Sequence, residues 1–266
     1  MNQILGLLMV IFSVSFATAD SKLDNYYGSD FLNQYSKNQL NNQTLVDQLF
    51  KVISNSHKPI PYESAKDVMF GRLFLKETAN GYEITDVYCE RKFTDADFGM
   101  GKVIGPMRSP TTGDVLNTEH TWPQSHFTNS FPKETQKADL HHLFPTDSKM
   151  NNERANYDFG NVISPKPGLK CPIAKLGSSG KNYVFEVPMK QRGNSARAIF
   201  YFSVRYKLLM PVAQEIALRG WAVQDPIDQQ EIDQNDIIQQ FQGNRNPFID
   251  MPDLLNHISA FSVQKK

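Results

Sequence analysis

Cysteine is scarce in this chain of 266 residues, which contains only Cys89 and Cys171. Two thiols at this separation in the sequence make neither a zinc knuckle nor a scaffold held by many disulfides. They can form one disulfide in an oxidising compartment, although the sequence does not show that they lie close together. The fold must therefore rest on a hydrophobic core, which a chain of this length can bury.

Net charge is also absent, because 28 Lys and Arg balance 28 Asp and Glu. The charge of the whole chain therefore does not indicate a polyanionic partner. Its distribution is uneven: residues 161–220 contain ten bases and two acids, whereas residues 221–266 contain three bases and seven acids. Two interpretations stay open. The basic segment is either one of two solvated faces of opposite charge or a surface that binds a phosphate backbone.

Long hydrophobic runs are missing beyond the first residues of the chain. Residues 1–19 carry no charge, and their apolar run from Ile4 to Phe16 is shorter than the roughly 20 residues of a membrane span. It ends in Ala17-Thr18-Ala19, which matches the small-x-small pattern of a signal-peptidase site. We therefore predict a secretory signal peptide over residues 1–19, although no Lys or Arg lies near Met1. Residues 20–266 are then one domain without membrane association.

Residue periodicity predicts a domain of the α+β class. The expected strands cover 81–89 and 183–187, and the expected helices cover 43–54, 147–156, 195–210, 211–218 and 228–241. Thr146 and Gly243 are the expected caps of the second and last of these helices. The helix over 195–210 should bury a stripe, with Arg197 and Arg205 lying off it. The stripe consists of Ala198, Ile199, Phe202, Tyr206 and Leu209.

The segment 117–156 carries the clearest chemical pattern. Glu119 and His120 end an extended stretch, and Asn151 and Arg154 follow on a predicted helix. An imidazole that titrates near neutral pH is a suitable base for activating water, so we assign that role to His120. A carboxylate and an amide oxygen form a sparse ligand shell that suits Mg²⁺, so Glu119 and Asn151 are the candidate metal ligands. These are the parts needed to cleave a phosphodiester with one metal ion.

Two points stay open in this segment. On a regular strand Glu119 and His120 would face opposite sides, so a bend or a loop must let both serve one site. Arg154 lies about one helical turn from Asn151 and would either bind a phosphate oxygen or form an internal ion pair with Asp147 or Asp158.

Asp139, His141 and His142 form a second polar group. Asp139 and His141 either bind a metal, or orient a neighbour, or belong to the scaffold, and we favour scaffold for His142. Zn²⁺ on the histidines is the alternative metal, but the nearby ligands are mostly oxygen, which favours Mg²⁺ or Ca²⁺. The sequence contains no His-Glu-x-x-His, Gly-x-Ser-x-Gly or phosphate-loop motif, so those enzyme classes are not supported.

Five strings in this order resemble the endonuclease I family of secreted and periplasmic non-specific nucleases. They are EHTWPQS at 119–125, DLHHLFP at 139–145, NNERAN at 151–156, RGNSARAIFYF at 192–202 and QGNRNPFID at 242–250. The resemblance implies a ββα-metal (His-Me finger) nuclease core embedded in a mainly helical domain. It also implies that such a protein cleaves DNA, and often RNA, to 5′-phosphate products with little sequence preference.

The resemblance implies roles for single residues as well. Glu119 and Asn151 would hold one divalent ion, with Mg²⁺ first and Ca²⁺ or Mn²⁺ as alternatives, and His120 would be the general base. Arg154 and Asn156 would help to hold the phosphate or the helix. The chain departs from the family at His142, where the family commonly has Asn, and it lacks an arginine that some relatives carry before Asn151.

We therefore expect phosphate contacts from other cations of the chain. The candidates are Lys133, Lys137, Arg197, Arg205 and Arg245. The expected partners are DNA or RNA backbones, and we expect a monomer. Two alternatives belong to other classes: a nucleic-acid-binding module without turnover on the same scaffold, and an extracellular structural or adhesion domain. Cleavage that EDTA abolishes would exclude the first, and retention on DNA that weakens with salt would exclude the second.

Overall fold

The computed structural model describes residues 14–99, 101, 103–110 and 115–262. The chain divides into two compact units, residues 1–41 and 42–266, and this division falls inside the range predicted as one domain. The first unit contains helices α1 (Val14–Tyr27) and α2 (Ser29–Ser36), whose Phe31 ring stacks with those of Tyr27 and Tyr35. Most of the predicted signal peptide lies outside the described residues. None of the described helices has both the length and the apolar character that crossing a bilayer requires.

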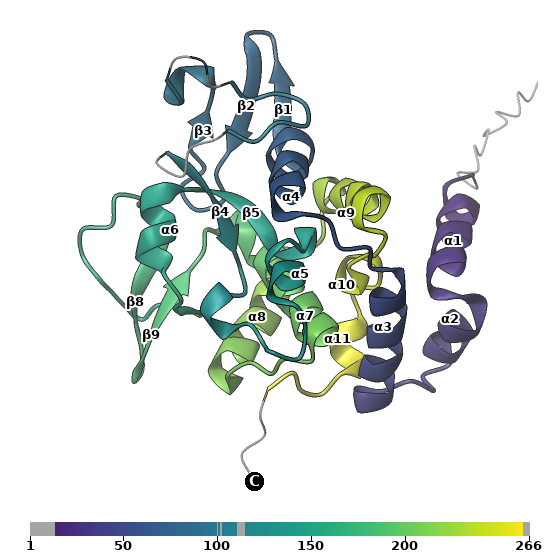
Figure 1. Cartoon of the computed structure of the whole chain (residues 1–266). Coiled ribbons are helices and arrows are strands. Elements are labelled where there is room, and N and C mark those ends of the chain that lie inside the picture. The colour runs from purple at the N-terminus through teal and green to yellow at the C-terminus, as the bar shows by residue number, and fades with distance from the viewer. Residues whose placement is uncertain (1–13, 100, 102, 111–114, 263–266) are drawn as a thin grey trace, which may run out of the picture. The chain divides into compact units, whose positions relative to one another are not determined.

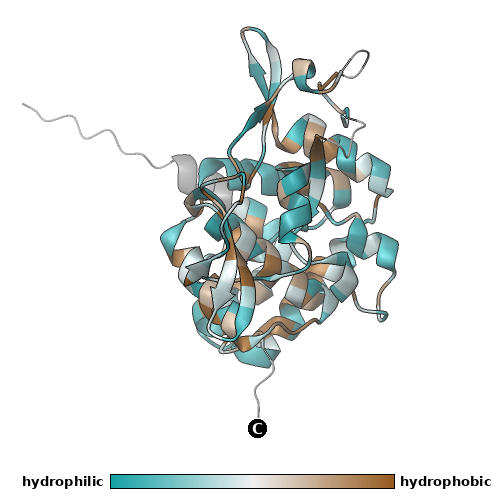
Figure 2. Ribbon diagram, turned by 90° about the vertical axis from the view of Figure 1, so that its left-hand side faces the viewer, coloured by the Kyte–Doolittle hydropathy of each residue, from teal (hydrophilic) through white to brown (hydrophobic). Residues whose placement is uncertain are grey.

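In its described residues, the second unit combines helices with three small sheets, which agrees with the predicted α+β class (Figure 1). Its helices are α3 (Asn42–Ser56), α4 (Tyr62–Val68), α5 (Lys133–Lys137), α6 (Ser148–Arg154), α7 (Arg192–Tyr206), α8 (Val212–Gln224), α9 (Gln229–Gln242), α10 (Pro247–Asp250) and α11 (Leu254–His257). Figure 2 shows hydrophilic residues along the outer turns of many helices and hydrophobic residues where elements pack together.

The three sheets are separate. The first has the antiparallel order β1 (Leu75–Thr78), β2 (Gly81–Thr85), β3 (Lys92–Phe93). The second is an antiparallel pair of β4 (Leu116–His120) and β5 (Leu143–Asp147). The third has the order β6 (Asp158–Phe159), β9 (Asn182–Glu186), β8 (Lys175–Ser179), β7 (Ser164–Pro165), and only its β6–β9 pair is parallel.

Strands β4 and β5 and helix α6 form a ββα unit in the segment that carries the clearest chemical pattern, 117–156. Strand β5 leads directly into α6, which contacts both β4 and β5. The Asp147 carboxylate accepts hydrogen bonds from the backbone N–H groups of Lys149 and Met150, so Asp147 caps this helix. Thr146 was expected as the cap, but it is a buried residue of β5. An acidic cap suits the positive end of a helix.

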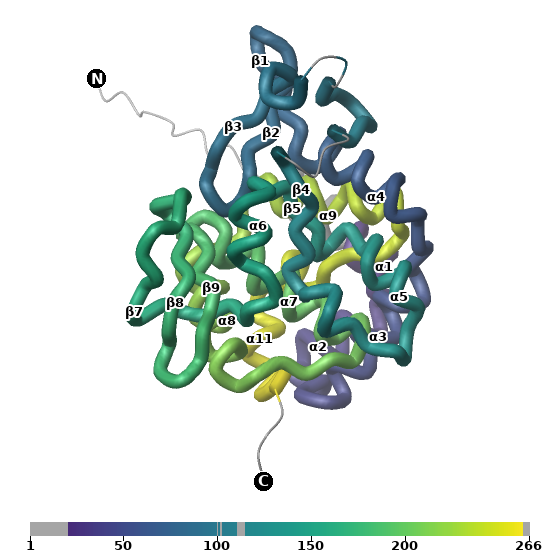
Figure 3. The backbone as a smooth tube through the Cα atoms, turned by 60° about the vertical axis from the view of Figure 1, so that its left-hand side comes forward, coloured from purple at the N-terminus to yellow at the C-terminus, as the bar shows by residue number. Residues whose placement is uncertain are grey.

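Helix α7 lies in the middle of the second unit, where α3, α8 and α10 all contact it (Figures 1 and 3). Every residue from Ser195 to Tyr206 is buried, which confirms the burial of the four predicted stripe residues within the helix but contradicts the expectation of a polar opposite face. A helix surrounded by other elements needs no polar face. Arg197 and Arg205 are buried, whereas Leu209 is exposed because the helix has already ended at Tyr206.

Other predicted elements are confirmed with small shifts at their ends. Helix α3 buries Leu45, Leu49 and Ile53, and α9 ends at Gly243, whose φ of 81° is the left-handed cap conformation. Strand β2 is shorter than predicted. The Asp86 carboxylate accepts backbone hydrogen bonds from Tyr88, Cys89 and Arg91, which turns the chain after Thr85.

Cys89 and Cys171 form a disulfide, with their Cα atoms 5.3 Å apart. The sequence had left this pairing open. The disulfide joins the segment after β2 to the segment before β8, across 82 residues of sequence. A crosslink over a loop of this length stabilises the fold by about 4.5 kcal/mol in the chain-entropy model.

Candidate active site

One open cavity, with a volume of about 450 Å³, brings the predicted chemical residues together. Its walls come from β4, from α6, from the turns that follow each of them and from the first residue of α4. The predicted residues that line it are Glu119, His120, Asn151, Arg154 and Asn156. Glu119 and His120 both reach the cavity because His120 is the last residue of β4 and the chain turns immediately after it.

Glu119 is held by an internal ion pair. Its Oε1 lies 3.2 Å from Arg154 Nη1, and the side chains are only 1% and 2% exposed. Arg154 also donates to the carbonyl oxygens of His120 at 3.1 Å and Thr121 at 2.6 Å. Burial raises the pKa of the Glu119 carboxyl above its usual value, and the neighbouring Arg154 guanidinium and Tyr88 hydroxyl reduce this rise without cancelling it. Arg154 therefore favours the ionised form of Glu119 and fixes the turn after β4.

Arg154 was one of two alternatives in the sequence, and the internal ion pair is the one observed. Its partner is Glu119 rather than Asp147 or Asp158. A guanidinium that is 2% exposed and bound to two carbonyls has little capacity left for a phosphate. The expectation of a direct phosphate contact from Arg154 is corrected on this ground.

The oxygen atoms of Glu119 and Asn151 fit a hard divalent cation. Glu119 Oε1 is buried beside Arg154 Nη1 and has no further hydrogen-bond partner among the described residues, while the Tyr88 hydroxyl lies near the carboxylate. Asn151 donates from Nδ2 to the carbonyl of Thr118 at 3.4 Å, which leaves its Oδ1 as the atom for a cation. Carboxylate and amide oxygens are ligands that Mg²⁺ and Ca²⁺ accept, and Mg²⁺ keeps several waters. Among the described residues, no group of three His, Cys, Asp or Glu is arranged to hold a metal ion.

His120 is held by hydrogen bonds at both ring nitrogens. Nε2 lies 3.2 Å from the carbonyl oxygen of Lys137, and Nδ1 lies 3.3 Å from Nε2 of Gln124. A carbonyl can only accept, so we assign the ring proton to Nε2 and the lone pair to Nδ1. Burial, with His142 nearby, lowers the pKa of His120 well below its usual value. The imidazole is therefore neutral at neutral pH and can accept a proton at Nδ1.

Asp139 lies outside the cavity, in a sealed hydrogen-bond network. Its carboxylate accepts from the hydroxyls of Tyr201 at 2.8 Å and Tyr206 at 2.9 Å, from Gln242 Nε2 at 2.8 Å and from the N–H of His141 at 3.2 Å. The nearby His57, His141 and His142 rings and the hydrogen bond from Gln242 lower the pKa of Asp139 despite its burial, so the carboxylate is ionised. Of the alternatives left open for Asp139, the observed contacts are those of a scaffold residue.

The two histidines of this network are also scaffold residues in their contacts. His141 Nε2 lies 3.2 Å from the carbonyl of Asn244, and His142 Nε2 lies 2.8 Å from the carbonyl of Gln136. Burial lowers the pKa of both histidines to about 4. The two rings face separate carbonyls, an arrangement that does not suit a shared Zn²⁺. His142 lies directly behind the site, with its ring centroid 5.3 Å from that of His120.

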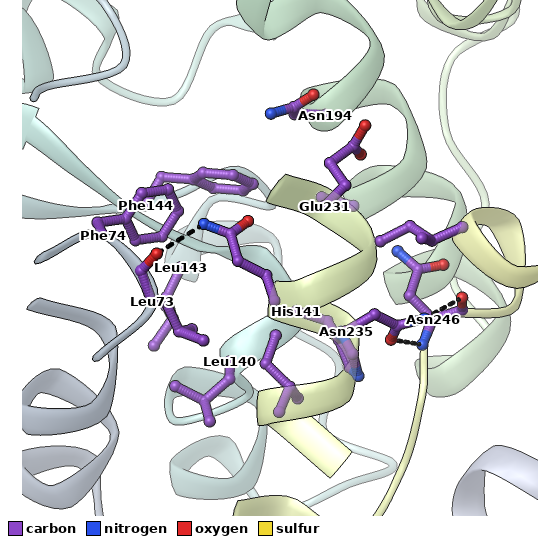
Figure 4. A pocket seen from close by; sticks show the side chains of 14 residues that line it. Leu73, Phe74, Leu140, His141, Leu143, Phe144, Asn194, Glu231, Asn235 and Asn246 are labelled. Atoms are coloured by element: carbon purple, nitrogen blue, oxygen red, sulfur yellow. Dashed lines mark hydrogen bonds between the residues drawn. The ribbon is translucent and has the colours of Figure 1, made fainter. Parts of the chain in front are cut away.

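His141 also borders a small internal cavity of about 30 Å³, enclosed by residues of α9 and of the segment that leads into β5. Figure 4 shows Leu140 and Leu143 on one side of this cavity and the hydrogen-bonded Asn235 and Asn246 on the other. This space has room for about one water molecule, so it is a packing gap rather than a substrate site.

The three arginines proposed as phosphate contacts are used inside the protein. Arg197 pairs with Glu231, Arg245 pairs with Asp236 and Asp250, and Arg205 donates to His57 Nδ1 at 3.0 Å. All three are buried. Their assignment to phosphate binding is corrected, because a guanidinium committed to buried partners is not available to a polyanion.

The remaining predicted residues lie at or near the surface. Lys133 is exposed at the start of α5, and Lys137 is half-buried at its end. Asn156 is exposed and lies 3.5 Å from the Ser125 hydroxyl, at the rim of the cavity. The sequence reasoning missed Tyr62, which lines the cavity from α4. No motif surrounds this tyrosine, so only its position in the fold reveals it.

Comparison with known proteins agrees with the residue patterns. A sequence model of the endonuclease I family matches residues 41–253, most of the chain. An extracellular ribonuclease of Bacillus amyloliquefaciens is 34% identical over 160 residues, covering 53% of each chain. An extracellular and a periplasmic deoxyribonuclease of Aeromonas hydrophila are each 33% identical over 114 residues, covering 43% of this chain and 49% and 48% of their own. This chain thus spans about half the length of these relatives.

Proposed function

Because the chain belongs to the endonuclease I family, we propose that it is a secreted or periplasmic endonuclease that hydrolyses phosphodiester bonds in DNA and RNA. Its ββα unit would be the ββα-metal (His-Me finger) core of a one-metal mechanism. The observation that carries the proposal is the shared cavity, in which Glu119, His120 and Asn151 meet. Contacts to the phosphate backbone rather than to base edges would make cleavage largely independent of sequence.

Each residue of the cavity would have one task. Glu119 and Asn151 would hold the cation, Mg²⁺ with Ca²⁺ or Mn²⁺ as alternatives, through Oε1 and Oδ1. The bound cation would stabilise negative charge on the phosphate and on the leaving 3′-oxygen, so that the product carries a 5′-phosphate. His120 would take a proton from the attacking water at Nδ1, while the Lys137 carbonyl keeps the other nitrogen protonated. Arg154 would act through Glu119 and through the turn after β4.

Location outside the cytoplasm is supported by three observations. The first residues have the pattern of a signal peptide, Cys89 and Cys171 form a disulfide, and the relatives are named extracellular or periplasmic nucleases. We propose residues 1–19 as the signal peptide and the mature protein as a monomer.

The direct test is incubation of the purified mature protein with plasmid DNA and with RNA, in EDTA and across a panel of divalent ions. The proposal expects internal cleavage of at least the DNA, with 5′-phosphate ends, restored after EDTA treatment by Mg²⁺. Binding without cleavage in every ion would instead identify a nucleic-acid-binding module on a nuclease scaffold.

A further inference from the structure

A phosphate bound in the cavity needs positive charge nearby. Arg154, the arginine in the cavity wall, does not provide it. Arg154 is the only basic residue among the described cavity walls, and its charge is balanced by Glu119. The α6 side of the site contributes amides and no free cation. Helices α4 and α5 lie on the other side of the β4–β5 pair from α6, as both views show (Figures 1 and 3). A strand of nucleic acid in this cavity would therefore find its cations on the α4–α5 side.

Tyr62 is the residue that this side presents to the cavity. It is the first residue of α4, directly after Pro61. Its ring centroid lies 5.7 Å from that of His120, with the planes at 34°. The two rings are in contact range, so Tyr62 restricts how far the imidazole can tilt toward α4. Its partly exposed aromatic surface is also one on which a base or sugar of any sequence can pack.

Lys137 is joined to the same tyrosine and to the same histidine. Its Nζ lies 4.3 Å from the centre of the Tyr62 ring, a cation–π contact. Its carbonyl oxygen is the partner of His120 Nε2. One residue thus places both a backbone acceptor behind the imidazole and an ammonium group beside it. Among the described residues, no carboxylate lies within ion-pair distance of this ammonium.

Lys66, one turn further along α4, adds a second and weaker contribution. Its Nζ lies 5.2 Å from the Tyr62 ring centre, and it pairs with Glu63 at 2.8 Å. The Glu63 carboxylate neutralises part of its charge, so Lys137 is the stronger candidate for a phosphate contact.

We propose that Lys137 binds the nucleic-acid strand beside His120 and that Tyr62 holds both residues in place. Lys137 contacts a backbone phosphate, and Tyr62 is a positioning residue that fixes both the ammonium and the imidazole. This inference rests on the proposed function, since it names the substrate contacts of that same site. It assigns these roles to Tyr62 and Lys137, neither of which lies in a string that carries the family resemblance.

The test separates binding from turnover. Binding of a short fluorescently labelled DNA duplex is measured in EDTA over a series of KCl concentrations, and plasmid cleavage is measured in Mg²⁺. The variants are Lys137→Gln, Lys137→Arg, Tyr62→Leu and Tyr62→Phe. Lys51→Gln, which removes an exposed charge from α3, is the charge-matched control. Thermal unfolding establishes that each variant folds.

Lys137→Gln should weaken binding by about tenfold and reduce the slope of log Kd against log salt by about one, with a larger effect on KM than on kcat. Lys137→Arg should keep the wild-type slope. Tyr62→Leu should lower kcat by about tenfold or more, because a misplaced base slows the chemical step, and Tyr62→Phe should restore it. Lys51→Gln should leave binding and cleavage unchanged.

The inference is overturned if the wild type cleaves DNA while Lys137→Gln behaves like Lys51→Gln. It is also overturned if Tyr62→Phe and Tyr62→Leu both match the wild type. Loss of folding in Tyr62→Leu would leave the two Lys137 variants to decide. Absence of any cleavage by the wild type, in every ion, would instead be a failure of the proposed function.

Discussion

The chain contains two acid–histidine groups close together in sequence, and they lie in different surroundings. Glu119 and His120 line an open cavity, whereas Asp139 and His141 are sealed behind it. The Asp139 carboxylate receives four hydrogen bonds from the protein. The Glu119 Oε1 atom has a charged neighbour but accepts no hydrogen bond from the described residues.

This difference shows how an acid–histidine group that can react differs from one that only supports the fold. A carboxylate whose acceptor sites are filled by the protein cannot also bind a cation, whereas one with an unfilled buried oxygen can. In both groups burial lowers the histidine pKa, so a shifted pKa does not distinguish them. The two groups differ in their access to the cavity and in whether the protein already binds every carboxylate oxygen.

The largest expected effect is the loss of the base. His120→Ala should reduce the rate of plasmid nicking by about 10²–10⁴-fold, because no other histidine lines the cavity among the described residues. Binding of labelled DNA in EDTA should stay close to wild type. His126→Ala, which removes an exposed histidine six residues away, is the matched control and should cleave normally. Equal nicking rates for the two variants would rule out His120 as the base.

Asp139→Asn should show the opposite pattern, with stability lost and chemistry retained. The hydroxyls of Tyr201 and Tyr206 both donate to Oδ2 of Asp139. An amide nitrogen in that position cannot accept these hydrogen bonds, so two buried hydroxyls lose their partner. We expect the free energy of unfolding to fall by about 3 kcal/mol, measured by urea denaturation. Cleavage per folded molecule should remain near wild type. A stable variant with little activity would move Asp139 from the scaffold to the site.

A smaller effect should follow from acid. The pKa values of His141 and His142 are lowered from 6.5 to about 4, so the unfolded chain binds more protons than the folded protein between these values. Stability from these two residues is complete above pH 6.5 and is lost as the pH falls toward 4. Each histidine should contribute a loss of about 1 kcal/mol per pH unit in this window. A urea midpoint that does not change between these limits would contradict their burial as neutral rings.

The sequence predicted the ligands better than their surroundings. Glu119, His120 and Asn151 were found because few residue types can hold a hard cation or act as a neutral base, and they meet in one cavity. The arginines were misassigned because a positive charge in a sequence does not show whether its partner is a phosphate or a buried acid such as Glu231. Burial is set by packing between elements far apart in the chain.

The same limit applies to the fold. The helices α3 and α9 were predicted from their own periodicity and caps. The complete burial of α7 was not, because it depends on the helices that surround it. The string at 242–250 also depends on contacts with residues far away in the sequence. Its Gln242 donates to Asp139, and its Asn244 donates to the Tyr201 hydroxyl, so it closes the buried network.

The central claim is that one cation, held by Glu119 and Asn151, supports cleavage at this cavity. Its most direct test is a Mg²⁺ titration of plasmid cleavage for the wild type, Glu119→Gln and Asn151→Ala. We predict no wild-type cleavage in EDTA, full recovery with Mg²⁺, and a shift of about 10–100-fold or more to higher Mg²⁺ in both variants. Cleavage in EDTA, or variants that follow the wild-type titration curve, would contradict it.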